Sequence, residues 1–465
     1  MNLNIFPGSP LHGGATLPGD KSLSHRAALF AALAEGESRI ENFLVSGVTR
    51  SMLEPLTALG VQWELEGTRL TVLGRGLHGL QSPSEALYCG NSATTMRLLA
   101  GALAATGIAA VLDGSPGLRR RPMKRIVEPL QAMGVPIEAS AGGCAPLILA
   151  ARPLSQKLRG LRHELSVASA QVKTTLLLAG LDADGPTTIV EPAASRDHTE
   201  RMLASMGAEI SVRAAVGSGQ FSSAESAMTI TTLDPLSFRH PSSTVQSPPP
   251  SFSLHPLSLT LPGDISSAAF LIVAALITPQ SQLVLREVGL NPTRDGLLEA
   301  LTAMGAETRI EERSLRGGEP LGNLIVRSSL LHGTQVGGAQ VVRMIDEFPI
   351  FAVAAAYADS PTLVRDAAEL RYKESDRIAA LCESLRALGV DIRETSDGFY
   401  LPGNTPPQGG SVQSFGDHRL AMSLAVAGLA ARGPVRVEGA EMMAESFPAF
   451  VETLRALGAN LQIEN

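Results

Sequence analysis

The sequence predicts a mixed α/β (α+β) protein of two similar domains, each made of three helix-and-strand units. Three observations predict this class. A phrase related to "LTALG" ends a helix-like segment six times along the 465 residues. Sequence typical of strands, with alternating apolar and polar residues, follows each phrase. The turn "LPGD" occurs at residues 17–20 and again at 261–264, where the order of the units starts afresh.

Each repeated phrase ends in a glycine that we expect to terminate a helix. Before the glycine, Leu and Ile recur at three- and four-residue intervals, as in "RIAALCESLRALG", which is the period of an amphipathic helix. A glycine directly after a helix can take the positive φ that other residues avoid. The repeat unit is about 70 residues long. The six glycines are Gly60, Gly134, Gly207, Gly305, Gly389 and Gly458.

The second "LPGD" marks the start of the second domain. The interval from Gly19 to Gly60 matches the interval from Gly263 to Gly305 to within one residue. We therefore expect an N-terminal domain at residues 16–258 and a C-terminal domain formed by residues 1–15 with 259–465. A Ser/Pro-rich tract at 242–259 predicts an exposed, mobile insertion, about 213–258, at the end of the first domain. A solenoid is the alternative, although its repeats are usually shorter, roughly 20–50 residues.

Composition narrows the class of partner. The formal net charge is −7, which disfavours nucleic acid and anionic membranes. Three scattered cysteines are too few for a disulfide framework or a zinc site. The N-terminus lacks a basic region followed by an apolar run, so no secretory signal is expected. The apolar run "FLIVAALI" is shorter than the ~20 residues of a membrane span. We expect a cytoplasmic monomer that binds small molecules, with no nucleic-acid or membrane partner.

Basic and small polar residues gather at particular turns of the units. Hydroxyls and small residues at the head of a helix leave backbone N–H groups available to an anion, aided by the helix dipole. Such residues recur in both halves of an acidic protein, which suits a multiply anionic small molecule held between two domains. The stretches are "GDKSLSHR", "CGNSATTMRLLAG", "DGSPGLRRRPMKR", "SVASAQVKTT", "SRDHTER", "RMIDEFP", "LRYKESDR" and "FGDHRLAMSLAVAG".

Taken singly, each stretch has a structural interpretation. "LRRRPMKR" is typical of a solvated surface loop. "DKSLSHR" suits a capped helix start, and "KESDR" an exposed helix face with i,i+3 and i,i+4 charge pairs. The histidines in "DHTE" and "DHR" lack metal-ligand spacing such as H-E-x-x-H, so no metal is expected.

Together, these motifs resemble the EPSP synthase family, the 3-phosphoshikimate 1-carboxyvinyltransferases. "LPGDKSLSHR", "GNSATTMRLLAG", "RRRPM", "ASAQVKTTLLLAGL", "SRDHTERML", "MIDEFPI", "KESDRI" and "GDHRLAM" occur in the family's order and spacing. The resemblance runs from about residue 7 to 460. It implies the enolpyruvyl transferase fold, an inside-out α/β barrel of two domains with three βαβαββ units each. It also implies transfer of the enolpyruvyl group of phosphoenolpyruvate to the 5-hydroxyl of shikimate 3-phosphate, with release of phosphate. No cofactor is implied.

The resemblance also assigns roles to residues of this sequence. Lys21 would touch both substrates. Asp346 would be the base for the 5-hydroxyl, and Glu374 the acid that protonates the methylene carbon. Shikimate 3-phosphate would be held by Lys21, Ser22, Arg26, Ser169, Ala170, Gln171, Ser195, Arg196, Asp346 and Lys373. Phosphoenolpyruvate would be held by Lys21, Asn91, Ala93, Thr94, Arg121, Gln171, Arg377, His418 and Arg419. Because these cations repel one another, an open form that closes on the substrates is expected.

Three positions depart from the plant and enteric branch of the family. Ala93 stands where that branch has Gly in "GNAGTAMR", and its methyl lies on the phosphoenolpyruvate side. Glu445 stands where that branch has Lys, and His198 where it has Tyr. All three predict membership of the glyphosate-insensitive class.

Two alternatives remain at this point. The sibling UDP-N-acetylglucosamine enolpyruvyl transferase has Lys-Asn where this chain has Lys21-Ser22, and it uses a loop cysteine that "DGSPGLRRRPM" lacks. A non-catalytic six-unit binding scaffold would not need Lys21, Asp346 and Glu374 to act at one site.

Overall fold

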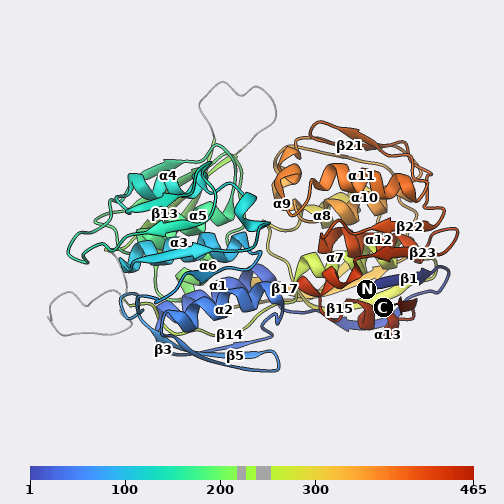
Figure 1. Cartoon of the computed structure of the whole chain (residues 1–465). Coiled ribbons are helices and arrows are strands. Elements are labelled where there is room, and N and C mark those ends of the chain that lie inside the picture. Colours follow the sequence, from blue (N-terminus) through green and yellow to red (C-terminus); the bar gives the residue numbers. More distant parts are fainter. Residues whose placement is uncertain (217–226, 237–252, 465) are drawn as a thin grey trace. The chain divides into compact units, whose positions relative to one another are not determined.

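The computed structural model describes residues 1–216, 227–236 and 253–464, which form two compact units (Figure 1). The N-terminal unit comprises Lys21–Leu261 with Arg316–Gly318. The C-terminal unit comprises Met1–Asp20, Pro262–Leu315 and Glu319–Asn465. Residues 16–20 therefore group with the C-terminal unit and residues 259–261 with the N-terminal unit, a few residues away from the boundaries expected from sequence.

Over the residues that the structure describes, each of the six expected units contains one four-stranded sheet. In each sheet one strand pairs in parallel with a second, which pairs antiparallel with a third. A fourth strand lies beside the third at the edge. The same pattern in both units confirms the predicted mixed α/β class with two similar domains.

The N-terminal unit holds three of these repeats. The first contains α1 (Lys21–Leu33), α2 (Gly47–Ala58), β3 (Glu35–Glu41), β4 (Gln62–Glu66), β5 (Arg69–Arg75) and β14 (Ser258–Thr260). The second contains β6 (Leu87–Tyr88), α3 (Ala93–Thr106), β7 (Ala110–Asp113), α4 (Lys124–Ala132), β8 (Ile137–Ala139) and β9 (Leu147–Leu149). The third contains β10 (Arg162–Glu164), α5 (Ala170–Gly180), β11 (Thr187–Glu191), α6 (His198–Ser205), β12 (Glu209–Val216) and β13 (Ala227–Asp234).

The C-terminal unit holds the other three. The fourth contains β2 (His12–Thr16), α7 (Ile265–Ile277), β15 (Gln282–Gly289), α8 (Gly296–Ala303), β16 (Thr308–Arg316) and β17 (Glu319–Arg327). The fifth contains β18 (Gln335–Val336), α9 (Ala339–Arg343), α10 (Phe348–Ala356), β19 (Thr362–Val364), α11 (Arg377–Ala387), β20 (Arg393–Thr395) and β21 (Gly398–Leu401). The sixth contains β22 (Gly410–Gln413), α12 (His418–Leu429), β23 (Val435–Glu438), α13 (Phe450–Ala456), β1 (Asn2–Phe6) and β24 (Asn460–Glu464).

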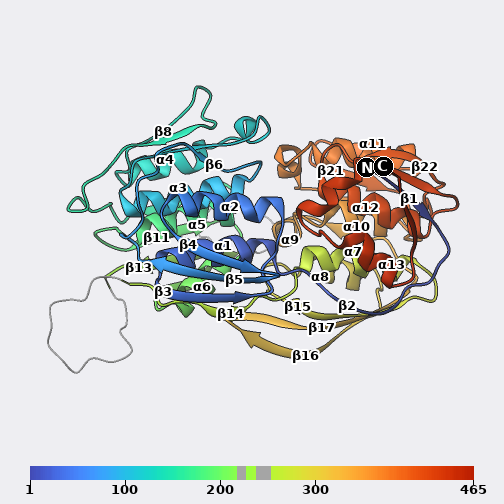
Figure 2. The same ribbon diagram turned by 60° about the horizontal axis from the view of Figure 1, so that its bottom comes forward.

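The first long helix of each repeat is the core of its unit. Every residue of α7, α10 and α12 is buried, and these three helices pack against one another. In the N-terminal unit α3 packs against both α1 and α5. Figure 2 shows the strands of the N-terminal unit on the outside of its helices. A helix that is apolar on all sides needs such a cover of neighbours.

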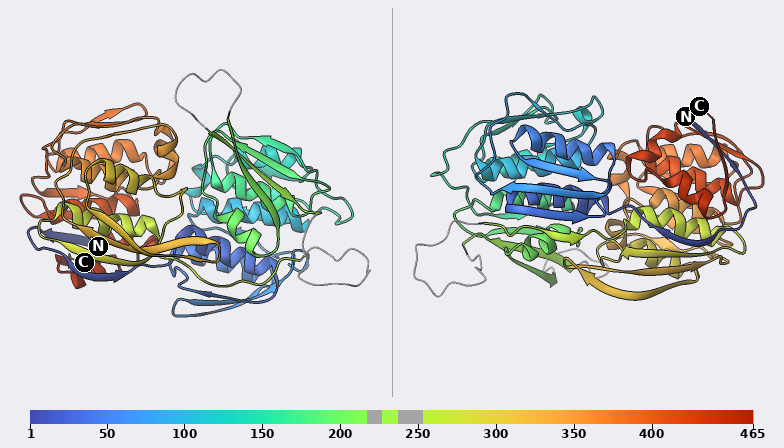
Figure 3. Two further views of the ribbon diagram at one scale, coloured as in Figure 1. Left: turned by 180° about the vertical axis from the view of Figure 1, so that it is seen from behind. Right: turned by 90° about the horizontal axis from the view of Figure 1, so that it is seen from below.

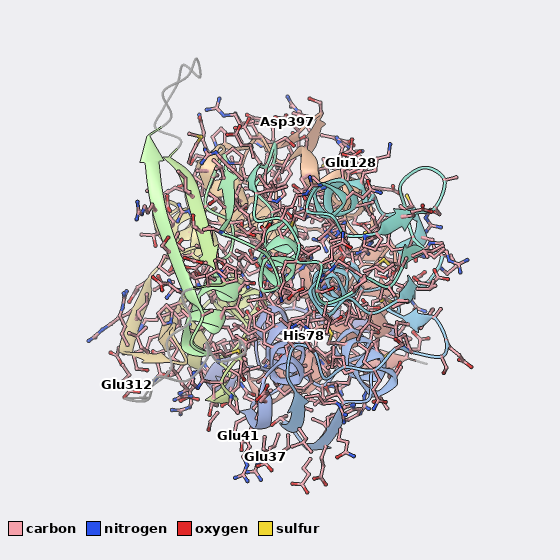
Figure 4. All side chains as sticks on the ribbon, turned by 90° about the vertical axis from the view of Figure 1, so that its left-hand side faces the viewer. Glu37, Glu41, His78, Glu128, Glu312 and Asp397 are labelled. Atoms are coloured by element: carbon pink, nitrogen blue, oxygen red, sulfur yellow. The ribbon has the colours of Figure 1, made fainter. Side chains whose placement is uncertain are left out.

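The strands turn their polar side chains away from this core. In β3, Ser38 and Ile40 are buried, whereas the alternate residues carry charge outward. Glu37 pairs with Arg39, and Glu41 pairs with Arg69 of the neighbouring strand. Figure 4 shows Glu37 and Glu41 extending from the outer side of the unit. This alternation is what a sheet with one solvated face requires.

The six repeated glycines terminate helices as predicted. Their φ angles lie between 81° and 112°. Each donates its N–H to a carbonyl in the last turn of the helix, as Gly60 does to Thr57 at 2.9 Å. A residue with a Cβ would be strained in this conformation, so the recurring glycine reflects the backbone rather than packing.

The two "LPGD" turns pair with each other in the C-terminal unit. Gly19 and Gly263 form an antiparallel bridge. The N–H of Asp20 donates to the carbonyl of Pro262 at 3.0 Å, and the N–H of Asp264 donates to the carbonyl of Pro18 at 2.9 Å. The chain thus leaves the C-terminal unit after one copy and returns at the other, so the duplicated turn is the crossover itself.

At each crossover, a strand joins a sheet whose other strands lie far from it in the sequence. β2 precedes the N-terminal unit in the chain but pairs with β15, and β14 follows most of that unit but pairs with β3. β1 lies between β23 and β24, so the first and last strands are neighbours and both ends of the chain emerge together (Figure 3).

The prediction of an exposed insertion at about 213–258 is wrong for most of the residues of this range that the structure describes. β12 and β13 pair over Glu209–Val216 and Ala227–Asp234 and complete the third sheet. Leu254 and Leu257 are buried in the core, and β14 belongs to the first sheet. Serine and proline dominated the composition and hid the short apolar pattern that forms these contacts. Residues 217–226 and 237–252 of the expected insertion lie outside the described residues.

Candidate functional site

Most of the residues singled out by sequence lie at or near the starts of buried helices. Lys21 begins α1, Ala93 begins α3 and Ala170 begins α5. In the C-terminal unit Arg377 begins α11 and His418 begins α12. The first N–H groups of a helix lack partners within it and carry partial positive charge, so these ends favour anions. Each unit therefore has helix starts of the kind that favours anions.

Arg26 stabilises the start of α1 and is only 2% exposed. Its Nε donates to the hydroxyl of Thr199 at 2.8 Å, and its guanidinium also donates to the hydroxyl of Thr174 at 2.9 Å and the carbonyl of Ser22 at 3.1 Å. Arg196 donates to the hydroxyl of Ser22 at 3.3 Å. Ser22, Arg26 and Arg196 thus form one cluster next to Lys21 in the chain, in which Arg26 is buried and Arg196 is half-buried.

Gln171 is fixed between α3 and α5. Its Nε2 donates to the hydroxyl of Thr94 at 2.8 Å, and its Oε1 accepts from Arg97 at 2.5 Å. Arg97 is buried and also donates to the carbonyl of Pro122 at 3.1 Å, beside Arg121. Arg97 stands in "CGNSATTMRLLAG", but the family resemblance assigned it no role. Its position four residues after Ala93 on the same helix face was the available signal.

The two helices that hold Gln171 touch at their backbones. A Cβ added at Gly101 of α3 would lie 2.4 Å from the carbonyl oxygen of Thr175 in α5. The hydroxyl of Thr175 donates to the carbonyl of Arg97 at 2.8 Å. This close approach sets the distance between Thr94 and Gln171, because no side chain separates the helices there.

Ser169, Ala170 and Ser195 lie around the start of α5. Ser169 is the N-cap, and its hydroxyl accepts from the N–H of Val172 at 3.5 Å. Ser195 is buried, and its hydroxyl has no hydrogen-bond partner among residues 1–216, 227–236 and 253–464. A buried hydroxyl of this kind can donate to an incoming anion at low cost. His198, the third departure from the enteric branch, begins α6 and is buried.

Arg119 and Arg121 of the basic loop "DGSPGLRRRPMKR" have different surroundings. Arg119 forms an ion pair with Asp113, which lowers the pKa of that carboxyl, so Arg119 serves the loop itself. Arg121 ends the 3₁₀ turn Leu118–Arg120 and is half-buried. Asn91 is exposed and accepts from the hydroxyl of Ser115 at 2.9 Å, which ties it to the same loop.

The C-terminal unit gathers its carboxylates on Arg377, whose side chain is 1% exposed. Its Nε donates to Asp417 at 2.8 Å, and its other nitrogens reach Glu374 at 2.5 Å and Asp346 at 3.3 Å. Burial alone lowers the pKa of Arg377, but Asp417, Glu374 and Asp346 outweigh it and raise that pKa above its ordinary value. The predicted base and the predicted acid therefore share one permanently charged partner.

Asp346 also contacts the second predicted arginine. Its Oδ2 lies 3.3 Å from Arg419, so Asp346 bridges Arg377 and Arg419. Lys373 lies nearby and contacts Glu369 at 3.6 Å. Desolvation lowers the pKa of Lys373, and nearby carboxylates oppose this only in part. An ammonium group with a lowered pKa can exchange a proton more readily near neutral pH.

His418 lies beside Glu445, one of the three residues that differ from the enteric branch. Its Nδ1 lies 3.7 Å from the carboxylate of Glu445. A carboxylate thus stands beside His418 where that branch has a cation. The two side chains are 3% and 29% exposed, so their interaction is partly shielded from water.

Arg294 is a further buried cation that the sequence analysis missed. It contacts Asp20 at 3.1 Å, Asp264 at 3.5 Å and Glu347 at 3.8 Å. The aspartates of both "LPGD" turns therefore meet on one guanidinium, beside the carboxylate that follows Asp346. Arg294 stands in "NPTRDG", and nothing local distinguishes it from a surface arginine.

His25 joins the starts of three helices. Its Nδ1 lies 2.8 Å from the carbonyl of Lys21, and its Nε2 lies 3.1 Å from the carbonyl of Val48 and 3.4 Å from the hydroxyl of Ser92. We assign the neutral ring with its proton on Nδ1, which donates to the nearer of the two carbonyls, that of Lys21. Burial lowers the pKa of His25 to about 4, and the carbonyl contacts oppose it only in part.

We predict that His25 makes the protein less stable in mild acid. In the unfolded chain the imidazole binds a proton near pH 6.5, whereas in the folded chain it resists protonation down to about pH 4. Stability is therefore present above pH 6.5 and is lost as pH falls towards 4. The contribution falls by about 2 kcal/mol between pH 7 and 5.

Urea unfolding of wild type and His25→Asn at pH 7 and 5 measures this effect. The difference in unfolding free energy between the two proteins should narrow at pH 5 by about that amount. An unchanged difference would contradict the assignment of a neutral His25.

Metal and membrane signals are absent from the part of the chain that the structure describes. No three His, Cys, Asp or Glu side chains gather there as a metal site. No helix there is both long and apolar enough to cross a membrane.

Comparisons with known proteins show what the chain is similar to. The family model of EPSP synthase (3-phosphoshikimate 1-carboxyvinyltransferase) matches residues 5–224 and 239–454. A 3-phosphoshikimate 1-carboxyvinyltransferase from Desulforudis audaxviator is 46% identical over 459 residues, covering 98% of this chain and 99% of that protein. The solved structure of EPSP synthase from Acinetobacter baumannii matches with a TM-score of 0.83 at 37% identity, covering 100% of both chains. The enolpyruvyl transferase NikO from Streptomyces tendae, at 21% identity, covers 99% of this chain and 98% of its own with a TM-score of 0.74 and shares the fold.

Proposed function

The chain belongs to the EPSP synthase family, and we propose that it transfers the enolpyruvyl group of phosphoenolpyruvate to the 5-hydroxyl of shikimate 3-phosphate. The products are 5-enolpyruvylshikimate 3-phosphate and phosphate, so the enzyme acts in the shikimate pathway of aromatic amino acid biosynthesis. The observation that carries the proposal is the cluster on Arg377, which brings a candidate base and a candidate acid to one cation. Neither alternative from the sequence is favoured by the family match.

The charge of the substrates explains the composition of the clusters. The two substrates bring two phosphates and two carboxylates. Arginine forks bind such oxygens in pairs, and a lysine supplies a point charge. We assign shikimate 3-phosphate to Lys21, Ser22, Arg26, Ser169, Ala170, Gln171, Ser195, Arg196, Asp346 and Lys373. We assign phosphoenolpyruvate to Lys21, Asn91, Ala93, Thr94, Arg121, Gln171, Arg377, His418 and Arg419.

The proton transfers fall to carboxylates of the C-terminal unit. Asp346 removes the proton of the 5-hydroxyl. The 5-oxygen then attacks the central carbon of phosphoenolpyruvate. Glu374 delivers a proton to the methylene carbon, so a tetrahedral adduct forms. Return of a methyl proton to Glu374 and loss of phosphate, which takes the proton held by Asp346, then give the enol ether and restore both carboxyl groups. Arg377 contacts both carboxylates at 3.3 and 2.5 Å, which supports coordinated roles for them.

Release of phosphate tests the activity directly. Phosphate should appear from phosphoenolpyruvate only when shikimate 3-phosphate is present. No release by the wild-type protein, or full release by a Lys21→Met variant, would refute the proposal. Lys21 is included because it begins α1 and is assigned to both substrates.

We also propose that the enzyme is insensitive to glyphosate, which occupies the phosphoenolpyruvate side. Ala93 is the first residue of α3 and is 5% exposed, so its methyl is held in place by its surroundings. Overpacking by one methyl costs about 1–3 kcal/mol. Ala93→Gly should therefore lower the glyphosate inhibition constant by roughly 10- to 100-fold.

The control makes the same change elsewhere on the helix. Ala100→Gly lies within α3, is fully buried and has no assigned substrate contact. It should lower stability by about 1 kcal/mol without changing inhibition. Tight inhibition of the wild-type enzyme, or an unchanged constant in Ala93→Gly, would contradict the proposal.

Two further properties complete the proposal. We expect a cytoplasmic location, because Cys89, Cys144 and Cys382 are free thiols, as is usual in a reducing compartment. We also expect a monomer. Light scattering should then give a mass near 48.6 kDa. We also expect the two units to close on the substrates, and small-angle scattering with both substrates should give a smaller radius of gyration than without them.

A further inference from the structure

A lysine and two glutamates form a buried ionic cluster in the N-terminal unit. Lys173 Nζ lies 2.8 Å from Glu191 Oε2 and 2.7 Å from Glu200 Oε1. The three side chains are 1% to 3% exposed. Desolvation of three charges is costly, and well-packed apolar residues often give equal or greater stability. The reaction described above uses none of the three, so another role is needed to explain them.

The lysine of the cluster is charged in the folded protein. Burial lowers the pKa of Lys173, but Glu200 and Glu191 outweigh it and raise that pKa above its ordinary value. The lysine therefore remains an ammonium group throughout the physiological pH range. A charged donor makes stronger hydrogen bonds than a neutral one, and the low local dielectric adds to this.

The cluster holds the backbone of both serines assigned to shikimate 3-phosphate. Glu191 Oε1 accepts the N–H of Ser169 at 3.0 Å. Lys173 Nζ lies 3.4 Å from the carbonyl of Ser195 and donates to it. Ser169 caps α5, whereas Ser195 lies in the loop between β11 and α6. One ion pair thus fixes two segments that only the fold brings together.

The second glutamate has a different neighbourhood. Glu200 lies in α6 and accepts from the hydroxyl of Thr231 at 3.4 Å. It shares Lys173 with Glu191, but no hydrogen bond joins it to the backbone of Ser169 or Ser195 in the described part of the chain. The cluster therefore contains one glutamate, Glu191, that accepts a hydrogen bond from the backbone of a serine assigned to the substrate, and one, Glu200, for which the described part of the chain shows no such bond.

We propose that Lys173 and Glu191 are positioning residues that place Ser169 and Ser195 for binding of shikimate 3-phosphate. The proposal rests on the proposed function, because the serines are assigned through it. With its N–H held by Glu191, Ser169 keeps its N-cap geometry and can donate its hydroxyl hydrogen to the phosphate. Ser195, whose carbonyl is anchored by Lys173, presents a hydroxyl without a described partner. The ion pair keeps the two donors at a fixed separation before the substrate arrives, which lowers the ordering cost of binding.

The two glutamates provide a matched pair of variants. Glu191→Gln and Glu200→Gln remove the same charge from the same lysine with the same change in shape. Only Glu191→Gln weakens the charge-assisted hydrogen bond to Ser169. A charge-assisted bond contributes enough that its loss corresponds to roughly tenfold in affinity.

The dissociation constant for shikimate 3-phosphate, measured by calorimetry on the full chain, separates the two variants. It should rise roughly tenfold in Glu191→Gln and stay within about twofold in Glu200→Gln. The KM for phosphoenolpyruvate at saturating shikimate 3-phosphate, and kcat, should match wild type in both. Glu191→Asp keeps the negative charge but shortens the side chain by one methylene, which lengthens the hydrogen bond to Ser169, and it should weaken binding as Glu191→Gln does. It serves as the second test if Glu191→Gln does not fold.

The possible outcomes distinguish a positioning role for Lys173 and Glu191 from a purely structural one. Wild-type affinity in a folded Glu191 variant, or an equal loss in Glu200→Gln, would overturn the positioning role in favour of a purely structural one. A parallel rise in the KM for phosphoenolpyruvate would do the same. Failure of the wild-type protein to bind shikimate 3-phosphate would instead refute the proposed function, whatever the variants do.

Discussion

Glu374→Gln is expected to lower kcat by roughly 10²- to 10⁴-fold, which is the usual contribution of one general acid. The amide keeps the shape of the side chain and its contact with Arg377 but has no proton to give to the methylene carbon. Binding of both substrates should change little, because phosphoenolpyruvate is held by the arginines. Single-turnover release of phosphate measures the chemical step apart from product release.

A control variant on the same segment isolates the chemistry. Glu383→Gln makes the same change on α11 at an exposed residue, and its kcat should equal that of wild type. If Glu374→Gln turned over at the wild-type rate, Glu374 would not be the acid, and Lys21 or Lys373 would become the next candidate. A variant that lost substrate binding with unchanged kcat would also contradict the assignment.

Arg377→Met is expected to destabilise the protein by about 3–5 kcal/mol and to abolish detectable turnover. The change leaves Asp417 fully buried without its 2.8 Å partner and removes the cation shared by Asp346 and Glu374. Unpaired buried carboxylates must be protonated or rehydrated, and either costs folding free energy. Urea unfolding at neutral pH measures the loss of stability, and the phosphate assay measures the loss of activity.

Two companion variants make the result specific. Arg386→Met, on the same helix, removes an arginine whose side chain is 51% exposed, lies 3.9 Å from Glu394 and donates to the carbonyl of Ile392 at 3.2 Å, so stability should change by about 1 kcal/mol or less. Arg377→Met combined with Asp417→Asn should regain part of the stability, because the buried charge is gone. Equal stability of Arg377→Met and Arg386→Met would show that the Arg377 cluster does not stabilise the fold.

The repeats were predictable because the signal is local. Gly60 and its five equivalents must take a positive φ after a helix, and this requirement is visible in any one copy. The same holds for residues at helix starts, such as Ala93 and Ala170, whose small side chains expose backbone N–H groups. The six-fold count and the candidate anion-binding turns could therefore be inferred from single stretches of sequence.

The partners that hold these residues could not be predicted in the same way. Arg97 and Gln171 are 74 residues apart in sequence, and Arg294 and Asp20 are 274 apart. Nothing near Arg294 in the chain says that three carboxylates will surround it. The strand β13 was missed for a related reason: its role depends on β11 and β12, and the tract around it is dominated by Ser and Pro.

The crossover at the paired "LPGD" turns has a consequence for the order of folding during synthesis. All strands of the three N-terminal sheets have been synthesised once β14 is made, so that unit can form before the C-terminal unit is complete. β1 and β2 are translated first, yet β2 needs β15, and β1 needs β23 and β24, the last strand of the chain. Domains generally fold as units during translation, so the opening residues must wait for the closing ones. The strand that emerges first is thus among the last to find its partners, and truncation of either end should leave the same sheet incomplete.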